Sequence, residues 1–109
     1  MVRSFEWDFR SSLEILDIQS VWQATGPYEW RAFDNDTYGV YIVARDPQTN
    51  LRIKITGDRP DYSLEMDFDV EPQRMDETRD LLFENVFTKL LPAAGATDLR
   101  PAGKPISGP

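Results

Sequence analysis

Residues 62–71 have the sequence YSLEMDFDVE. Apolar and polar side chains alternate over this whole stretch, which is the pattern of a β-strand with one buried and one solvated face. The pattern places five side chains in a core: Tyr62, Leu64, Met66, Phe68 and Val70. The polar side chains between them, four of which are acidic, face the other way.

The stretch before this strand alternates in the same manner. Leu51, Ile53 and Ile55 are separated by polar residues, and the sequence GDRPD at residues 57–61 is typical of a turn. The two strands are therefore expected to form a hairpin. That pairing puts Lys54 near Glu65 and Arg52 near Asp67, and each opposite-charge pair contributes about 0.2–1 kcal/mol.

The stretch after the strand predicts a long helix. Pro72 suits a first helical turn, and residues 73–91 carry an apolar stripe wide enough to face a core. Pro92 is expected to end the helix. The stripe consists of Met75, Leu82, Phe83, Val86 and Leu90.

The N-terminal part predicts one strand and one shorter helix. Alternating aromatics at residues 5–9 indicate a strand, and Ser11 followed by Glu14 forms a capping box. The box predicts a helix from Ser12 to about Ala24. A strand over residues 13–18 is the alternative, because the amphipathic pattern is imperfect.

Two further strands are expected at residues 28–33 and 38–45. The second is apolar on both sides, which is typical of a strand with both faces covered. The N-terminal elements or a second subunit would supply the cover. The predicted fold is α+β, with an antiparallel β-meander of about four to five strands, a long C-terminal helix packed on one face and a shorter N-terminal helix. Residues 1–95 are expected to form the single domain and residues 96–109 a flexible tail rich in Pro and Gly.

Negative charge is concentrated in one segment. Residues 57–86 contain ten acidic and three basic residues, so this segment carries the net charge of −7 of the 109-residue chain. Such a field favours a basic partner and disfavours direct nucleic-acid binding. The chain has no run of apolar residues long enough for a membrane span and no apolar signal block in residues 1–10, so a cytoplasmic location is expected.

The chain has no cysteine and no histidine. Nucleophilic triads, thiolate chemistry and sulfur-ligated zinc are therefore excluded. The segment 34–39 has two aspartates but lacks the later oxygen ligands of a calcium loop. No cofactor or metal is expected, and the protein is expected not to be an enzyme. An enzyme using carboxylates, or Tyr38, Tyr41 or Tyr62 as an acid, is the remaining catalytic alternative.

The favoured hypothesis is an acidic protein-binding module that engages a basic surface of a partner protein. Inhibitors and neutralising proteins of the immunity, antitoxin or anti-defence type in bacteria and phages work in this way. The alternatives are a solvated, partly ion-paired sheet face without a binding role, and a homodimeric adaptor or secretion-type chaperone that binds a client segment. The expected contact residues are Asp58, Asp61, Glu65, Asp67, Asp69 and Glu71.

Overall fold

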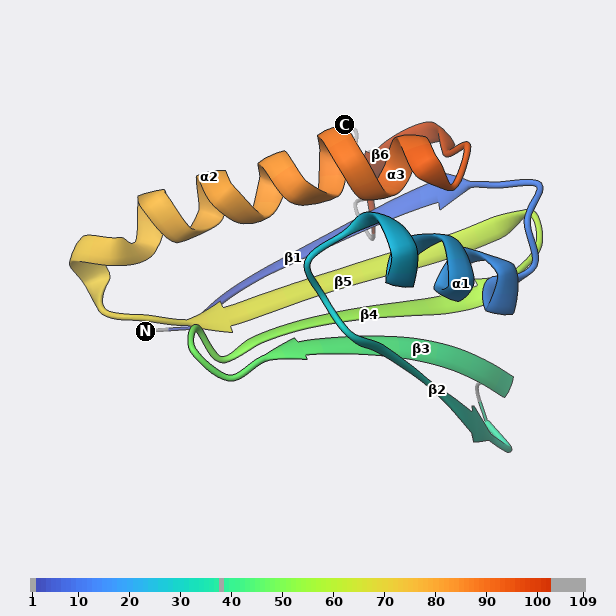
Figure 1. The fold of residues 1–109 in the computed structure, drawn as a ribbon, viewed down its shortest axis with the longest axis horizontal. Helices are drawn as coiled ribbons and strands as arrows, with labels where there is room; N and C mark the ends of the chain where they lie inside the picture. The colour runs from blue at the N-terminus through green and yellow to red at the C-terminus, as the bar shows by residue number, and fades with distance from the viewer. Residues whose placement is uncertain (1, 38, 103–109) are drawn as a thin grey trace, which may run out of the picture.

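A twisted antiparallel sheet forms one layer and the helices form the other (Figure 1). The computed structural model describes residues 2–37 and 39–102. The elements in chain order are β1 (Val2–Arg10), α1 (Ile15–Thr25), β2 (Trp30–Asn35), β3 (Gly39–Asp46), β4 (Leu51–Asp58), β5 (Asp61–Asp69), the 3₁₀ turn η1 (Pro72–Arg74), α2 (Met75–Asn85), the π-helical turn η2 (Val86–Leu90), α3 (Leu91–Ala93) and β6 (Thr97–Pro101).

The described residues form six strands in the order β2-β3-β4-β5-β1-β6. Strands β2 to β5 are the expected meander. The N-terminal strand β1 then pairs with β5 along its whole length, from Val2 opposite Asp69 to Arg10 opposite Asp61. The α+β class, the antiparallel sheet and the two main helices are confirmed, but the strand count was too low. Alternation identifies a strand without showing which strand lies beside it.

The register of the β4–β5 hairpin agrees with the sequence. Arg52 lies opposite Asp67, and Lys54 lies opposite Glu65. The apolar residues between them, such as Ile53 and Met66, are buried. A short turn joining two alternating strands leaves little freedom of register, because a one-residue slip would turn the apolar set to solvent.

The long C-terminal helical run covers residues 72–93, close to the predicted range. Pro92 does not end it; Pro92 lies near the start of α3, and the run ends at Ala93 before Gly95, whose φ is 65°. The π-helical turn η2 comes immediately before this proline. The first residues of a helical segment have backbone N–H groups without a carbonyl partner in that segment. A proline, which has no N–H group, therefore loses no hydrogen bond there.

The segment for which the sequence allowed either a helix or a strand forms the helix α1. The helix begins three residues later than predicted, and Glu14 at its N-cap makes no side-chain cap hydrogen bond. The Ser11 hydroxyl instead accepts from the Leu13 amide at 3.1 Å and donates to the Ala94 carbonyl at 2.7 Å. A tertiary contact thus uses the hydroxyl that the capping box would have required.

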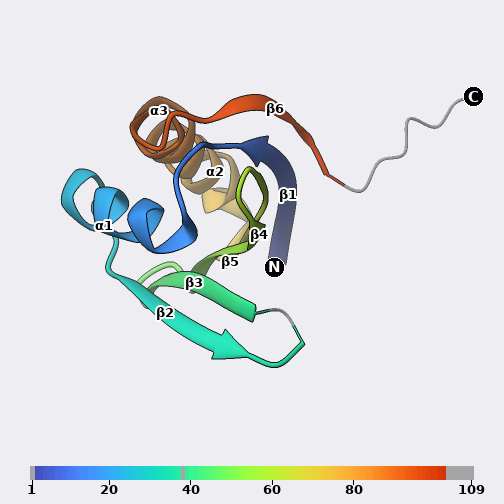
Figure 2. The ribbon, with the colours of Figure 1, turned by 90° about the vertical axis from the view of Figure 1, so that its right-hand side faces the viewer.

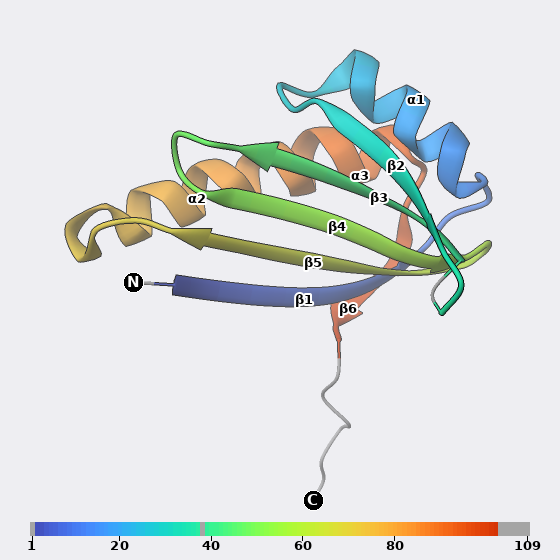
Figure 3. The ribbon, with the colours of Figure 1, turned by 90° about the horizontal axis from the view of Figure 1, so that it is seen from below.

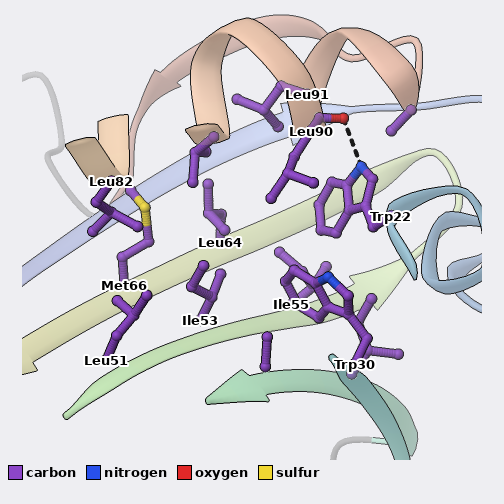
Figure 4. Close-up of a cluster of buried hydrophobic side chains, with 14 of the residues drawn as sticks. Trp22, Trp30, Leu51, Ile53, Ile55, Leu64, Met66, Leu82, Leu90 and Leu91 are labelled. Carbon is purple, nitrogen blue, oxygen red and sulfur yellow. Dashed lines mark hydrogen bonds between the residues drawn. The ribbon is translucent and has the colours of Figure 1, made fainter. Parts of the chain in front are cut away.

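The core lies between the helices and one face of the sheet, and Figure 4 shows its centre. Trp22 of α1 is 1% exposed, and its indole Nε1 donates to the Leu90 carbonyl at 2.6 Å. On β1, Phe5 packs edge-on against Phe83, with ring centroids 4.9 Å apart. The first contact joins α1 to the C-terminal helical run, and the second joins that run to β1.

The region expected to be a tail begins with strand β6, which pairs with β1 through Trp7 opposite Pro101 and Asp8 opposite Arg100. The Ala102 amide also donates to the Glu6 carbonyl at 3.0 Å. The expected domain boundary at residue 95 therefore does not coincide with the end of the sheet. Residues 103–109 lie outside the described part of the chain.

One face of the sheet carries no helix. Figure 2 shows α1 and α2 on the same side of the sheet, and Figure 3 shows the opposite face with no described element over it. The N-terminal elements therefore do not cover the second face of β3, and cover by a second subunit stays a prediction. Val43 on the open face is only 8% exposed, but its cross-strand neighbours there are Arg31 and Lys54. The long side chains of Arg31 and Lys54 can cover the apolar atoms of Val43, so that no second layer of helices or strands is needed.

Candidate protein-binding face

The open face of the sheet is divided by charge. Its β1 and β5 side carries acidic side chains, here called the acidic strip: Glu6, Asp8, Glu65, Asp67 and Asp69. Its β2 and β3 side carries arginines and apolar side chains, here called the basic corner: Arg31, Phe33, Tyr41, Val43 and Arg45. Arg52 and Lys54 of β4 lie between the two.

The acidic strip contains a direct like-charge pair. Glu6 on β1 lies opposite Glu65 on β5, because these two strands pair with that register. Next to this pair, Asp8 accepts a hydrogen bond from the Ser63 hydroxyl at 2.9 Å. Like charges directly opposite on one face of a sheet destabilise it. This pair therefore lowers the stability of the sheet.

Arg52 compensates part of the strip. Its Nη2 lies 3.0 Å from Asp67 Oδ2 and 3.8 Å from Glu65 Oε2. The three side chains are 29–37% exposed, so water weakens the attraction between them. This is the partly ion-paired arrangement that the sequence allowed.

The six predicted contact residues are only partly brought together. Glu65, Asp67 and Asp69 share the open face of β5. Asp58 and Asp61 lie opposite each other at the hairpin turn, where Asp61 binds Arg10 Nε at 3.1 Å. Asp61 and Asp69 are separated by about 27 Å at the usual rise per strand residue.

Glu71 lies beyond the end of β5 and accepts a hydrogen bond from Gln73 at 2.9 Å. The acidic side chains of α2, such as Glu77 and Glu84, are exposed on the other layer of the molecule. Neither group joins the strip. Glu6 and Asp8 were not among the predicted contact residues. Their alternation with Phe5, Trp7 and Phe9 predicts a strand, but it does not show that this strand pairs with β5.

The basic corner surrounds a hollow of about 310 Å³, lined by Glu29, Arg31, Phe33, Val43 and Arg45. Phe33 is 45% exposed, and its ring stacks on Tyr41 with centroids 5.4 Å apart. Lys54 Nζ lies 5.0 Å from the Tyr41 ring centroid. This corner was not predicted either, because its residues belong to two strands whose pairing the sequence does not show.

Of the three tyrosines considered as catalytic acids, Tyr41 and Tyr62 lie in the described part of the chain. The buried Tyr62 hydroxyl donates to the Leu13 carbonyl at 2.6 Å. Burial raises the pKa of Tyr62, and the nearby Glu14 carboxylate raises it further. Tyr41 stacks on Phe33, and Tyr38 lies outside the described residues. Within residues 2–37 and 39–102, no three acidic side chains are grouped so that they could hold a metal ion.

Comparison of the chain with protein-family models, curated proteins and solved structures found no match. Among the helices that the structure describes, none has the length and apolar character needed to cross a membrane.

Proposed function

We propose that the protein is a non-enzymatic binding module whose acidic strip docks onto a basic surface of a partner protein. The observation that carries this proposal is the position of the strip: its carboxylates lie on the one sheet face over which no described element packs. A cytoplasmic inhibitor or neutralising protein that occupies the basic, phosphate-binding surface of a nucleic-acid-handling target is the role that this chemistry fits best.

The pair formed by Glu6 and Glu65 supports the proposal energetically. A pair of like charges costs stability in the free protein. A basic side chain of a partner placed between the two carboxylates would remove that cost and gain two attractions. Binding would therefore relieve a repulsion that destabilises the free protein.

The concentration of charge supports it kinetically. The whole net charge of −7 arises in residues 57–86, which include β5 and, on the other layer, α2. A field of one sign accelerates encounter with a surface of the opposite sign and orients the two proteins before contact. Such binding weakens as salt screens the charges.

The test compares two variants with the same net charge. The strip variant carries Glu6→Gln, Glu65→Gln and Asp69→Asn. The control carries Glu77→Gln, Asp80→Asn and Glu84→Gln on the exposed side of α2. Each immobilised chain is incubated with native cell extract at low and high salt, and captured proteins are quantified by mass spectrometry.

The proposal predicts a basic protein that the native chain and the helix control capture at low salt. The strip variant should lose it, and high salt should release it. Equal capture by all three chains, or the lack of any basic protein in the native capture, would contradict the proposal. Both variants must give the circular dichroism spectrum of the native chain.

The second candidate is a homodimeric adaptor or client-binding chaperone, and the exposed Phe33 beside Tyr41 on the open face is the observation that favours it. Light scattering distinguishes the two functions. A dimer whose mass is independent of concentration supports the adaptor, and a monomer supports the module proposed above.

A further inference from the structure

Strand β2 forms one edge of the sheet. It pairs with β3 on one side, from Trp30 opposite Ala44 to Asn35 opposite Gly39. Within the described residues, no strand pairs with its other side; at the start of β2, the Trp30 amide donates to Gln23 Oε1 at 2.8 Å and the Trp30 carbonyl accepts from Gln19 Nε2 at 3.2 Å. Residues 31–34 are exposed, and they contain no proline to block pairing. An edge of this kind can accept an extended segment as an added strand.

The basic corner supplies side-chain chemistry beside this edge. Arg45 has no ion pair or hydrogen bond through its side chain within the described part of the chain, and it lines the same hollow as Arg31. Arg31 has one weak partner, Glu29, at 3.9 Å, and both side chains are about three-quarters exposed. Arg31 and the exposed Phe33 thus lie on the edge strand β2, and Arg45 lies on the neighbouring strand β3.

We propose that β2 binds an extended acidic segment of another protein as an added antiparallel strand. Arg31 and Phe33 are two residues apart and both face the open side. The added strand therefore places an apolar side chain opposite Phe33 and, two residues later, an acidic side chain opposite Arg31. The recognised pattern is apolar-any-acidic within an extended segment.

The charge of the corner selects this occupant over a second copy of the chain. A two-fold pairing of β2 with its own copy would bring Arg31 of both copies to one seam, with Arg45 of each copy one strand away on β3. Cations on both sides of a seam repel each other, whereas an acidic segment neutralises them.

This inference does not rest on the proposed function, because the residues involved are different. The edge β2 and the acidic strip lie on opposite sides of β4 in the sheet. Variants of the acidic strip should therefore leave binding at β2 intact, and variants of β2 should leave capture of a basic partner intact. Failure of either proposal can be recognised separately.

The test is a fluorescence anisotropy titration with a labelled peptide of sequence SVTVTETS. One control peptide replaces its glutamate with lysine. A second carries N-methyl groups on alternate backbone amides, which blocks strand pairing. The protein variants are Arg31→Glu and, as a matched control, Arg100→Glu on the opposite edge strand β6.

We expect the native chain and Arg100→Glu to bind the acidic peptide alike. Arg31→Glu should weaken binding about tenfold or more, since a charge reversal replaces an attraction with a repulsion. Neither control peptide should bind at the same concentration. Thermal unfolding of both variants shows whether the fold is retained.

Three results would overturn the proposal: no binding of the acidic peptide by the native chain, equal binding by Arg31→Glu, or equal binding of the N-methylated peptide. Light scattering adds a fourth. A native dimer that Arg31→Glu dissociates would show that the edge pairs with a second copy instead.

Discussion

Glu6 and Glu65 lie directly opposite each other on β1 and β5, on the sheet face that carries no helix. Two carboxylates in this position repel each other across the ladder. Arg52 reaches Glu65 only at 3.8 Å and is closer to Asp67, at 3.0 Å. The effect of this repulsion on the stability of the fold can be measured separately from its effect on the proposed binding.

Glu6→Gln is therefore expected to stabilise the fold by about 0.2–1 kcal/mol, because it removes the repulsion and breaks no ion pair among residues 2–37 and 39–102. Urea unfolding at low salt measures the change, which should shrink as salt is added. Glu84→Gln on α2 is the control and should have little effect. A loss of stability in Glu6→Gln would show that this carboxylate contributes to folding.

The two buried tryptophans that pack against each other give a second prediction. Trp22 Nε1 donates to the Leu90 carbonyl at 2.6 Å, whereas Trp30 Nε1 is buried and has no hydrogen-bond partner in the part of the chain that the structure describes. Replacement by phenylalanine removes similar volume at both sites. Trp22→Phe should cost about 1–3 kcal/mol more than Trp30→Phe, because only Trp22→Phe leaves a buried carbonyl without its indole donor.

Urea unfolding of the two variants, with the slope of the transition checked for two-state behaviour, gives the comparison. Equal costs would mean that the Trp22 hydrogen bond contributes nothing beyond packing. A larger cost at Trp30 would mean that its indole is better satisfied than the contacts indicate.

Local patterns predicted much of this fold. The alternation in residues 62–71 and the short turn before it fixed the register that places Arg52 opposite Asp67. The apolar stripe predicted the helical run within a few residues. Both results depend on signals between residues close in sequence, where one face must be buried and slippage is costly.

Contacts between distant residues could not be predicted in this way. The pairing of Glu6 with Glu65 and the bond from Ser11 to Ala94 depend on how separate segments pack. Two of the five residues of the acidic strip, Glu6 and Asp8, and the start of α1 were missed for that reason. The basic corner was missed because a single sequence does not show which aromatic side chains face the open side.

The Tyr62 hydroxyl gives a prediction for alkaline pH. Burial, followed by the nearby Glu14 carboxylate, raises the pKa of Tyr62. A tyrosine with a raised pKa keeps its proton in the folded chain at a pH where the unfolded chain has lost it. Its contribution to stability is therefore complete below about pH 10 and decreases as the pH rises above that value.

Tyr62→Phe removes the hydrogen bond to the Leu13 carbonyl and should cost about 0.5–1.5 kcal/mol near neutral pH. Its stability should also fall less steeply above pH 10 than that of the native chain. Unfolding in urea at several pH values measures both effects. Tyr28→Phe is a useful comparison, because burial also raises the pKa of Tyr28. An unchanged alkaline slope in Tyr62→Phe would show that other groups cause the loss.

Strand β6 leads to the last prediction, which concerns the C-terminal boundary of the domain. Its residues are exposed, yet it pairs with β1, and the Ala102 amide donates to the Glu6 carbonyl. A chain ending at Ala96 loses these backbone hydrogen bonds and should be less stable by about 1–3 kcal/mol. A chain ending at Ala102 keeps them and should match the full-length protein. If the two truncated chains unfold at the same urea concentration, β6 does not contribute to the stability of the sheet; a difference between them places the boundary of the folded domain after β6.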